Sequence, residues 1–341
     1  MESKRIKYLD IARAIGIIFV IIGHISQNEM ITSIIYSFHM PLFFILSGYL
    51  YSKGNIKSKV KRILIPYFVF SIISYLYWLC IERNFRGQDG NEITLFLNIF
   101  IARAGSENYL FNAVMWFLPC LLVTQLIYSG VDKIIKNKYL KTVIIVLFSL
   151  VGYVLSKIEI VRLPFALDVS FMALLFYFLG HCLKCVEDKY KLFKRINNSL
   201  KNKIITSIFL VVLFICLIGL VLINGPINMN EMKYNSYILS VLNACIGSTI
   251  ILMISVLINS NKFLEFVGKN TLTIMCIHEP IKRVLIYVLA KILKVNQVSL
   301  RTNIFSILFI SLTLLIICLI ITFGLKKIIN IIKQKNRNNK K

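Results

Sequence analysis

The stretch YLDIARAIGIIFVIIGHISQ at residues 8–27 decides the fold class, because an apolar run of this length crosses a membrane as a helix. Similar runs recur along most of the chain. The protein has 341 residues, of which 57% are hydrophobic and 16% charged, and its mean hydropathy is +0.76. Soluble domains carry about 25% charged residues, so this composition excludes a soluble enzyme, a secreted disulfide-rich domain, a coiled coil and a disordered chain.

A search for runs of about 20 mostly apolar residues predicts an all-α, polytopic membrane protein with ten transmembrane helices. The predicted spans are residues 8–27, 34–52, 63–81, 112–131, 141–156, 166–184, 204–223, 235–258, 270–290 and 303–325. The segment 93–103 is too short to cross, and we expect it to be interfacial or re-entrant. Residues 1–325 are expected to form one membrane domain, followed by a basic cytoplasmic tail at 326–341.

The chain carries 40 Lys and Arg against 15 Asp and Glu, a net charge of +25. In a soluble protein this excess would suggest nucleic acid. Here most of the bases lie in alternate segments between the apolar runs, which is typical of the positive-inside rule and of attraction to anionic lipid. We therefore predict both termini in the cytoplasm, contact with membrane lipid and no nucleic-acid partner. Asp10 and Arg13 interrupt the start of the first run and no small-residue cleavage site follows, which indicates a retained span and not a signal peptide.

The eight cysteines lie mostly within apolar runs, where Cys packs as a small hydrophobic residue. Cys182 and Cys185 form a CxxC beside His181, but a zinc site would need a second pair of ligands. We expect these residues to pack near a helix end. The sequence predicts neither a metal site nor a bound cofactor.

Ionisable residues inside an apolar span are costly and therefore indicate function. The first span carries Asp10, Arg13 and His24. Arg13 and His24 are separated by about three helical turns, which places them on one face roughly 16 Å apart along the axis. Asp10 lies one turn before Arg13 and is expected to neutralise it. The face combines a cation near the cytoplasmic surface with an imidazole deeper in the membrane.

The second span returns through FHMPLFFILSGYLY, residues 38–51. Its His39 is expected at the same depth as His24, and Ser47 closer to the cytoplasm. Two imidazoles above a basic site suit acyl transfer, in which His acts as general base or carries the acyl group. Lys59 and Arg62 lie one turn apart at the cytoplasmic mouth of the third span, where they either clamp phosphates or form a positive-inside loop.

Four further residues are candidates for substrate binding: Trp116, Asp168, His278 and Glu279. Trp116 suits either an aromatic belt or a pocket wall. Asp168 is expected to pair with a histidine or to be an interfacial acid. His278 and Glu279 precede Pro280 near the middle of the ninth span, and they suit either catalysis or a buried structural hydrogen bond.

The chain resembles the membrane acyltransferase 3 family along nearly its whole length, with the family's motifs in order. These are KYLDIARAIGIIFVIIGHIS (7–26), FHMPLFFILSGYLY (38–51), KRILIPYF (61–68), WFLPCLL (116–122), FYFLGHCL (176–183) and GKNTLTIMCIHEP (268–280). Arg13 and His24 match the family's Arg-x10-His pair. Lys59 and Arg62 match a basic pair that is often RxxR, with Lys here in the first position.

The resemblance implies a membrane acyltransferase domain over residues 1–325, similar to bacterial O-acetyltransferases that modify surface polysaccharides. It implies a multi-pass location in a bacterial plasma membrane, an acyl-CoA donor (usually acetyl-CoA) from the cytoplasm and a carbohydrate hydroxyl as acceptor. In the mechanism we expect, Arg13, Lys59 and Arg62 hold the donor phosphates. His24 then accepts the acyl group or deprotonates the hydroxyl, and His39, Asp168 or His278 orients it.

Two other classes of function fit the spans and the buried charge. A transporter or flippase of glycan intermediates would show no acyl-CoA consumption. A membrane sensing module would bind a ligand without turnover and tolerate loss of His24. Neither accounts for the spacing of Arg13 and His24.

Overall fold

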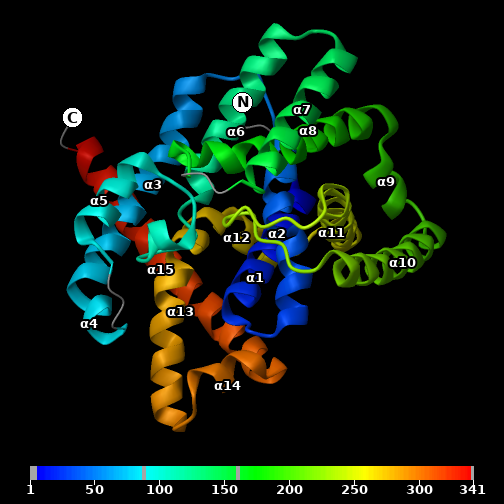
Figure 1. The fold of residues 1–341 in the computed structure, drawn as a ribbon. Coiled ribbons are helices and arrows are strands. Elements are labelled where there is room, and N and C mark those ends of the chain that lie inside the picture. The colour runs from blue at the N-terminus through cyan, green and yellow to red at the C-terminus, as the bar shows by residue number, and fades with distance from the viewer. Residues whose placement is uncertain (1–5, 87–89, 159–161, 339–341) are drawn as a thin grey trace.

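The computed structural model describes residues 6–86, 90–158 and 162–338, and these residues are arranged almost entirely in helices (Figure 1). The long helices, each of at least 18 residues, are α1 (Lys7–Ile25), α2 (Glu29–Tyr49), α3 (Ile56–Tyr77), α6 (Phe117–Ile134), α7 (Lys138–Leu155), α8 (Leu167–Tyr190), α10 (Leu200–Asn224), α11 (Tyr237–Ile258), α13 (Thr271–Leu293) and α15 (Ile304–Asn338).

Shorter helical segments connect the long ones. They are α4 (Arg83–Arg86), α5 (Glu92–Ile101), α9 (Leu192–Asn197), α12 (Lys262–Lys269) and α14 (Gln297–Thr302), the π-turn η1 (Trp78–Glu82), and the 3₁₀ turns η2 (Ser106–Tyr109) and η3 (Pro164–Ala166). Within the described ranges no β-strand forms, and an isolated bridge joins Asn228 to Lys233. The predicted all-α fold is confirmed.

Most helix starts are capped by the side chain of a polar residue that precedes the apolar run. Each of these side chains accepts a hydrogen bond from a backbone N–H of the first turn, which would otherwise be unsatisfied. The capping residues are Asn28, Asn55, Asn91, Asn137, Ser199, Ser236, Asn261 and Asn296. The caps explain why the chain can enter a new helix so soon after leaving the previous one.

Each predicted span corresponds to one long helix, and most ends are shifted by a few residues. The larger shifts are at α3, which begins at Ile56 where the span was predicted from 63, and at α15, which ends at Asn338 where 325 was predicted. Nine helical segments in the described part of the chain are long and apolar enough to cross a membrane. The remaining predicted span, 270–290, corresponds to α13, which at 23 residues is long enough to cross. It carries Glu279, Lys282 and Arg283, too many charges for composition alone to mark it as a span. The short segment predicted at 93–103 forms α5, a helix of 10 residues.

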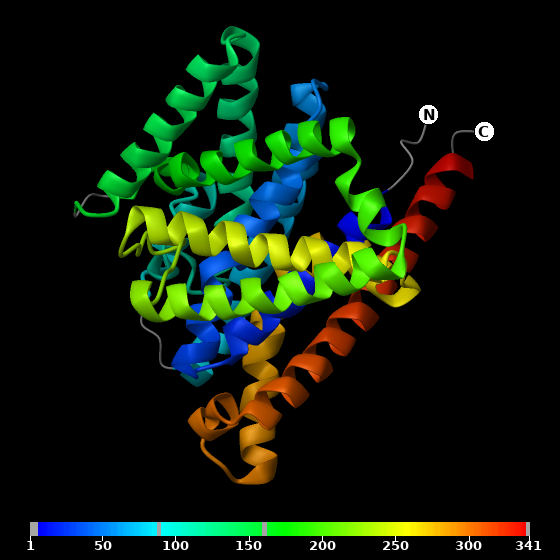
Figure 2. The same ribbon diagram turned by 90° about the vertical axis from the view of Figure 1, so that its right-hand side faces the viewer.

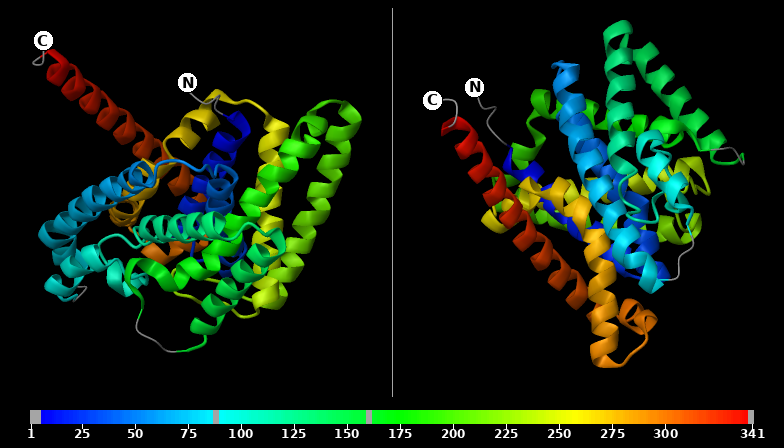
Figure 3. Two further views of the ribbon diagram at one scale, coloured as in Figure 1. Left: turned by 90° about the horizontal axis from the view of Figure 1, so that it is seen from above. Right: turned by 90° about the vertical axis from the view of Figure 1, so that its left-hand side faces the viewer.

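Figure 2 shows α10 and α11 side by side, and the start of α1 and the end of α15 on the same side of the molecule. The α1–α2 and α13–α14 connections lie on the opposite side. Helix α15 crosses the outside of α13 and α1 (Figure 3). Helices α1 and α2 are largely buried, whereas α7 and α10 leave most of their apolar surface exposed, as suits contact with lipid.

Two glycines allow α2 and α8 to touch along their backbones. A Cβ at Gly48 would lie 1.8 Å from the Tyr177 carbonyl oxygen, and one at Gly180 would lie 2.0 Å from the Ile45 carbonyl oxygen. Small residues are common where membrane helices approach closely, since dispersion contacts between backbones replace the hydrophobic effect as the driving force. This contact sets the position of α2, which carries His39, Phe43 and Ser47.

The structure differs from the sequence prediction at the ends of two helices. Helix α13 continues to Leu293, a short way beyond the predicted end of the span at 290. Helix α15 continues through 326–338, so the described part of the predicted tail begins as a helical extension. Residues 339–341 lie outside the described residues. Both extensions arise because backbone hydrogen bonds continue a helix beyond the end of its apolar run.

We expect Gly180→Val to lower the melting temperature in detergent, because the added side chain cannot fit against Ile45 without moving α2 from α8. Overpacking of this kind costs about 1–3 kcal/mol. Gly219→Val is the matched control, since no described atom lies within 4 Å of a Cβ at that glycine on α10. Equal melting temperatures for the two variants would contradict the importance of this contact.

Candidate active site

A cavity of about 340 Å³ lies between α1, α2, α3, α6 and α13, and we call it the basic cavity. Its charged and polar lining includes Arg13, Ser47, Lys59, Arg62 and Gln125. Among the described residues that line it there is no Asp or Glu. The structure thus brings together the four residues that the sequence placed nearest the cytoplasm. Three cations around one cavity favour an anionic ligand.

Arg13 reaches the basic cavity from α1 and is oriented by Asp10. Arg13 Nη1 donates a hydrogen bond to Asp10 Oδ1 at 3.0 Å, and the Asp10 side chain is buried. Gly268 of α12 packs against the Asp10 backbone so closely that a Cβ would lie 1.8 Å from the carbonyl oxygen. Asp10 lines neither this cavity nor the one described next, so it acts by positioning Arg13.

Lys59 and Tyr51 form one wall of the basic cavity. Lys59 Nζ donates to the Ser52 carbonyl oxygen at 2.5 Å and lies 5.2 Å from the centroid of the Tyr51 ring. The Tyr51 hydroxyl donates to Asp132 Oδ2 at 3.1 Å. Burial, followed by the negative charge of Asp132, raises the pKa of Tyr51, so its phenol stays protonated. This wall of the cavity therefore pairs the Lys59 side chain with an uncharged phenol.

A second cavity, of about 150 Å³, lies toward the outer end of α1, and we call it the histidine cavity. Its polar and aromatic lining includes His24, Tyr36, His39, Ser106, Trp116, Asn228 and Asn230. His24 and His39 therefore line the same cavity. Trp116 forms part of its wall and is buried. Amide and hydroxyl groups beside aromatic rings are suited to a polar organic ligand.

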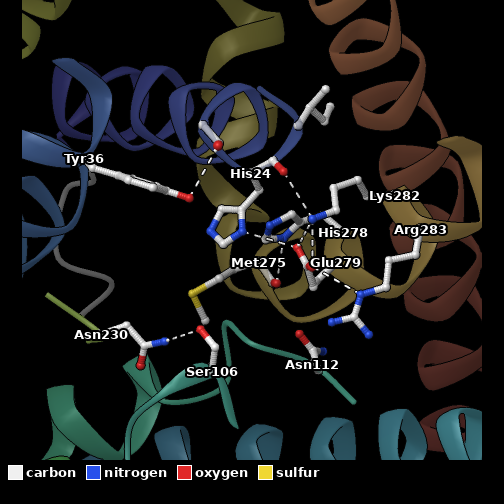
Figure 4. Close-up of polar contacts among 12 residues, drawn as sticks. His24, Tyr36, Ser106, Asn112, Asn230, Met275, His278, Glu279, Lys282 and Arg283 are labelled. Atoms are coloured by element: carbon white, nitrogen blue, oxygen red, sulfur yellow. Dashed lines mark hydrogen bonds and ion pairs between the residues drawn. The ribbon is translucent and has the colours of Figure 1, made fainter. Parts of the chain in front are cut away.

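His24 is held between Tyr36 and a group of charged residues (Figure 4). Its Nδ1 lies 3.3 Å from Glu279 Oε2, and its ring meets His278 edge to face at 5.3 Å between centroids. Lys282 Nζ donates to the His24 carbonyl oxygen at 3.2 Å. When Nδ1 donates its proton to the Glu279 carboxylate, Nε2 keeps a free lone pair. That geometry suits a general base.

Glu279 is the centre of a buried ion cluster on α13. Lys282 Nζ donates to both Glu279 oxygens, at 2.7 and 2.8 Å, and Arg283 Nε lies 3.3 Å from Glu279 Oε1. Arg283 Nη1 also contacts Glu82 of the π-turn η1 at 3.0 Å. Cation and carboxylate neutralise each other inside the protein, which offsets the cost of burying them. The cluster fixes the orientation of His24.

His39 and His278 each have one ring nitrogen on a backbone carbonyl. His39 Nδ1 bonds the Ile35 carbonyl at 2.8 Å, and its ring lies 4.9 Å from the Tyr36 ring. His278 Nδ1 bonds the Met275 carbonyl at 2.8 Å. His278 Nε2 is buried and has no hydrogen-bond partner among the described residues. These bonds hold both rings in one orientation. Nε2 of each ring is the nitrogen that does not bond the backbone.

His24, His278 and Glu279 place their donor atoms within 4.8 Å of one another, a spacing compatible with a metal ion. However, Lys282 and Arg283 already share the Glu279 carboxylate. A divalent ion bound here would either displace these two side chains from Glu279 or be repelled by their positive charges, and both effects oppose its binding. We assign the cluster to acid–base chemistry.

Three apolar side chains separate the two cavities. Phe43 of α2, Phe117 of α6 and Met275 of α13 line both of them. In Figure 4 the Met275 side chain extends from α13 toward the space between His24 and the Ser106–Asn230 pair. The cations of the basic cavity and the imidazoles of the histidine cavity therefore lie on opposite sides of these three apolar side chains, which we call the partition.

The predicted pairing of Asp168 with a histidine is wrong. Asp168 Oδ2 accepts a hydrogen bond from Arg162 Nε at 2.6 Å, and Asp168 lines neither cavity. Its buried carboxylate needs a cation, and Arg162 of the preceding segment reaches it over a short loop. His181 also lines neither cavity. It pairs with the Tyr128 hydroxyl at 2.5 Å, and its ring packs against the Tyr51 ring at 5.0 Å between centroids.

Sequence reasoning missed several residues of the site. Lys282 and Arg283 gave a usable signal, since each follows Glu279 by about one helical turn. Tyr36, Ser106 and Asn230 gave none, because ordinary polar residues near loops are brought to the cavity only by the packing of distant segments. The Ser106 hydroxyl and Asn230 Nδ2 lie 3.4 Å apart although the residues are far apart in sequence.

Comparison with known proteins matches residues 6–323 to the family described as "Acyltransferase domain". The chain belongs to the membrane acyltransferase 3 family. No curated protein and no solved structure matches this acyltransferase. The family match supports membrane acyltransferase activity and a multi-pass location in a membrane. It does not favour the transporter or the sensing module.

We expect Glu279→Gln to destabilise the acyltransferase, because Lys282 and Arg283 would lose the charge that neutralises them. Removing one partner of a buried ion pair costs about 3–5 kcal/mol. Chemical denaturation in detergent micelles measures this loss. Glu265→Gln is the control, since Glu265 is only half-buried and accepts a hydrogen bond from the exposed Ser260 hydroxyl at 2.9 Å. A Glu279→Gln protein as stable as the control would refute the role of the cluster.

Proposed function

We propose that this acyltransferase transfers an acyl group, acetyl in the first instance, from cytoplasmic acyl-CoA to a hydroxyl of a cell-surface or lipid-linked carbohydrate. The observation that carries the proposal is the pair of adjoining cavities. One is lined by cations and the other by imidazoles, with an apolar partition between them. A donor with an anionic nucleotide and a neutral thioester at its far end matches this order of chemistry.

The basic cavity suits the phosphates of acyl-CoA. Arg13, Lys59 and Arg62 approach it from α1 and α3, and a phosphate accepts charge-assisted hydrogen bonds from such groups. Lys59 binds as a point charge, whereas Arg62 offers the planar fork that suits phosphate. With the nucleotide held here, the extended arm of the donor points toward Met275 and His24.

His24 supplies the general base in this proposal. Nε2 takes the proton of the acceptor hydroxyl while the hydroxyl oxygen forms a bond to the thioester carbonyl carbon. The carbon–sulfur bond then breaks, and the thiolate receives the proton from His24, releasing CoA as its free thiol. Glu279 stabilises the transient imidazolium through Nδ1, at the observed 3.3 Å. No group is oxidised or reduced, and no cofactor is required for the balance.

The lining of the histidine cavity supports a carbohydrate acceptor. Ser106, Asn228 and Asn230 offer hydroxyl and amide groups that can pair with sugar hydroxyls. Trp116 and Tyr36 supply aromatic faces and edges beside them. His39 lies on the same wall, where it can hold the hydroxyl that His24 activates.

We expect His24→Ala to abolish acyl transfer, because the other described nitrogens on Glu279 belong to Lys282 and Arg283, which are cations and cannot act as the base. Inside-out vesicles given acetyl-labelled CoA would report label in the polysaccharide or lipid-linked fraction and release of free thiol. His181→Gln is the matched control, since His181 lines neither cavity. Retained transfer by a normally expressed His24→Ala protein would disprove the assigned role.

Lys59→Ala and Arg62→Ala should each raise the KM for acyl-CoA by about tenfold or more, the value of a charge-assisted hydrogen bond. Because the phosphates are bound equally in the ground state and the transition state, kcat should change little. Lys57→Ala is the control, as Lys57 is exposed on the same helix and lines neither cavity. An equal KM in all three variants would place the donor elsewhere.

A further inference from the structure

The partition between the cavities is built from large apolar side chains on three different helices. The Phe43 and Phe117 ring centroids lie 6.0 Å apart, and Phe44 packs behind Phe117 at 5.2 Å. Gly16 of α1 supports Phe43 closely, since a Cβ there would lie 3.1 Å from Phe43 Cζ. The two aromatic rings therefore have little room to retreat, and Met275 is the flexible member of the partition.

The charges on the two sides of the partition determine which part of a donor can cross it. Three cations favour keeping the phosphates in the basic cavity, and an apolar passage opposes entry of any charged group. The neutral end of the donor, with its thioester, is the part that can pass between Phe43, Phe117 and Met275. His24 lies on the other side of the partition and lines the smaller cavity.

The size of the histidine cavity limits what can be delivered. Its volume is about 150 Å³. A protein cavity of about 150 Å³ holds one benzene molecule, so the histidine cavity has room for only a few heavy atoms. An acetyl group and the reacting edge of the sugar fill such a space, and the rest of the carbohydrate lies outside it. The two further methylenes of a butyryl group would have to fit against Phe43, Phe117 and Met275, which also line this cavity.

We propose that Phe43, Phe117 and Met275 determine the acyl length of the reaction, admitting acetyl and excluding butyryl and longer chains. The inference rests on the proposed function and adds the residues that discriminate between donors. The reaction itself is unchanged: the carbon–sulfur bond of the thioester breaks, the ester carbon–oxygen bond forms, and the hydroxyl proton leaves with the CoA thiol. The partition selects the length of the acyl chain whose carbonyl carbon can reach the hydroxyl.

The test uses inside-out vesicles from the cells that make the protein, which hold its own acceptor, with acetyl-CoA or butyryl-CoA labelled in the acyl group. The wild type should transfer butyryl at least about tenfold less than acetyl, the discrimination that an apolar pocket achieves for added methylenes. Met275→Ala should raise the butyryl-to-acetyl ratio by about tenfold. Met253→Ala, which shortens a half-buried Met of α11 that lines neither cavity, should leave the ratio unchanged.

Phe43→Leu provides a second and milder opening of the partition, and immunoblotting measures the amount of each variant in the membrane. Equal use of both donors by the wild type would overturn the inference. An unchanged ratio in both Met275→Ala and Phe43→Leu, with acetyl transfer retained, would do so as well. The absence of wild-type label with either donor would instead overturn the proposed function.

Discussion

The neutralisation of buried charge around Glu279 is the constraint on which the rest of the site depends. Ionised side chains are costly inside a membrane protein unless they are paired. Here Lys282 and Arg283 share Glu279 within α13, His24 approaches it from α1, and Glu82 reaches Arg283 from the π-turn after α3. Three segments far apart in sequence must therefore meet in one arrangement, and that arrangement directs His24 into its cavity.

Close helix packing converts this electrostatic centre into two separate compartments. The backbone contact of α2 with α8 at Gly48 and Gly180 leaves α2 no freedom to move sideways. The Phe43 ring packs closely against Gly16 of α1, so this member of the partition has little room to move. Cations collect on one side of it and imidazoles on the other. The proposed transfer from an anionic donor to a neutral acceptor requires this separation.

The parts of the site predicted from sequence were those whose signal lies within one segment. Arg13 and His24 were identified because ionisable residues interrupt an apolar run, and the Asp10–Arg13 pair follows from its one-turn spacing. Asp168 shows where this reasoning fails: its need for a partner was evident, but a neighbouring arginine satisfied it in place of a histidine. Glu82 and Ser106 were missed because their importance lies only in contacts across the fold.

The sequence by itself determined the all-α class and the approximate position of each long helix, because a helix that crosses a membrane must satisfy its own backbone hydrogen bonds and most of these helices are apolar along their length. Those requirements concern a single segment, so the sequence of that segment is enough to recognise a helix that meets them. Only the tertiary structure decided that His24 meets Glu279, that Asp168 meets Arg162, and that Phe43, Phe117 and Met275 divide two cavities. Those contacts depend on how the helices pack, and packing is determined by the fit between the surfaces of two helices, which the sequence of one segment does not contain.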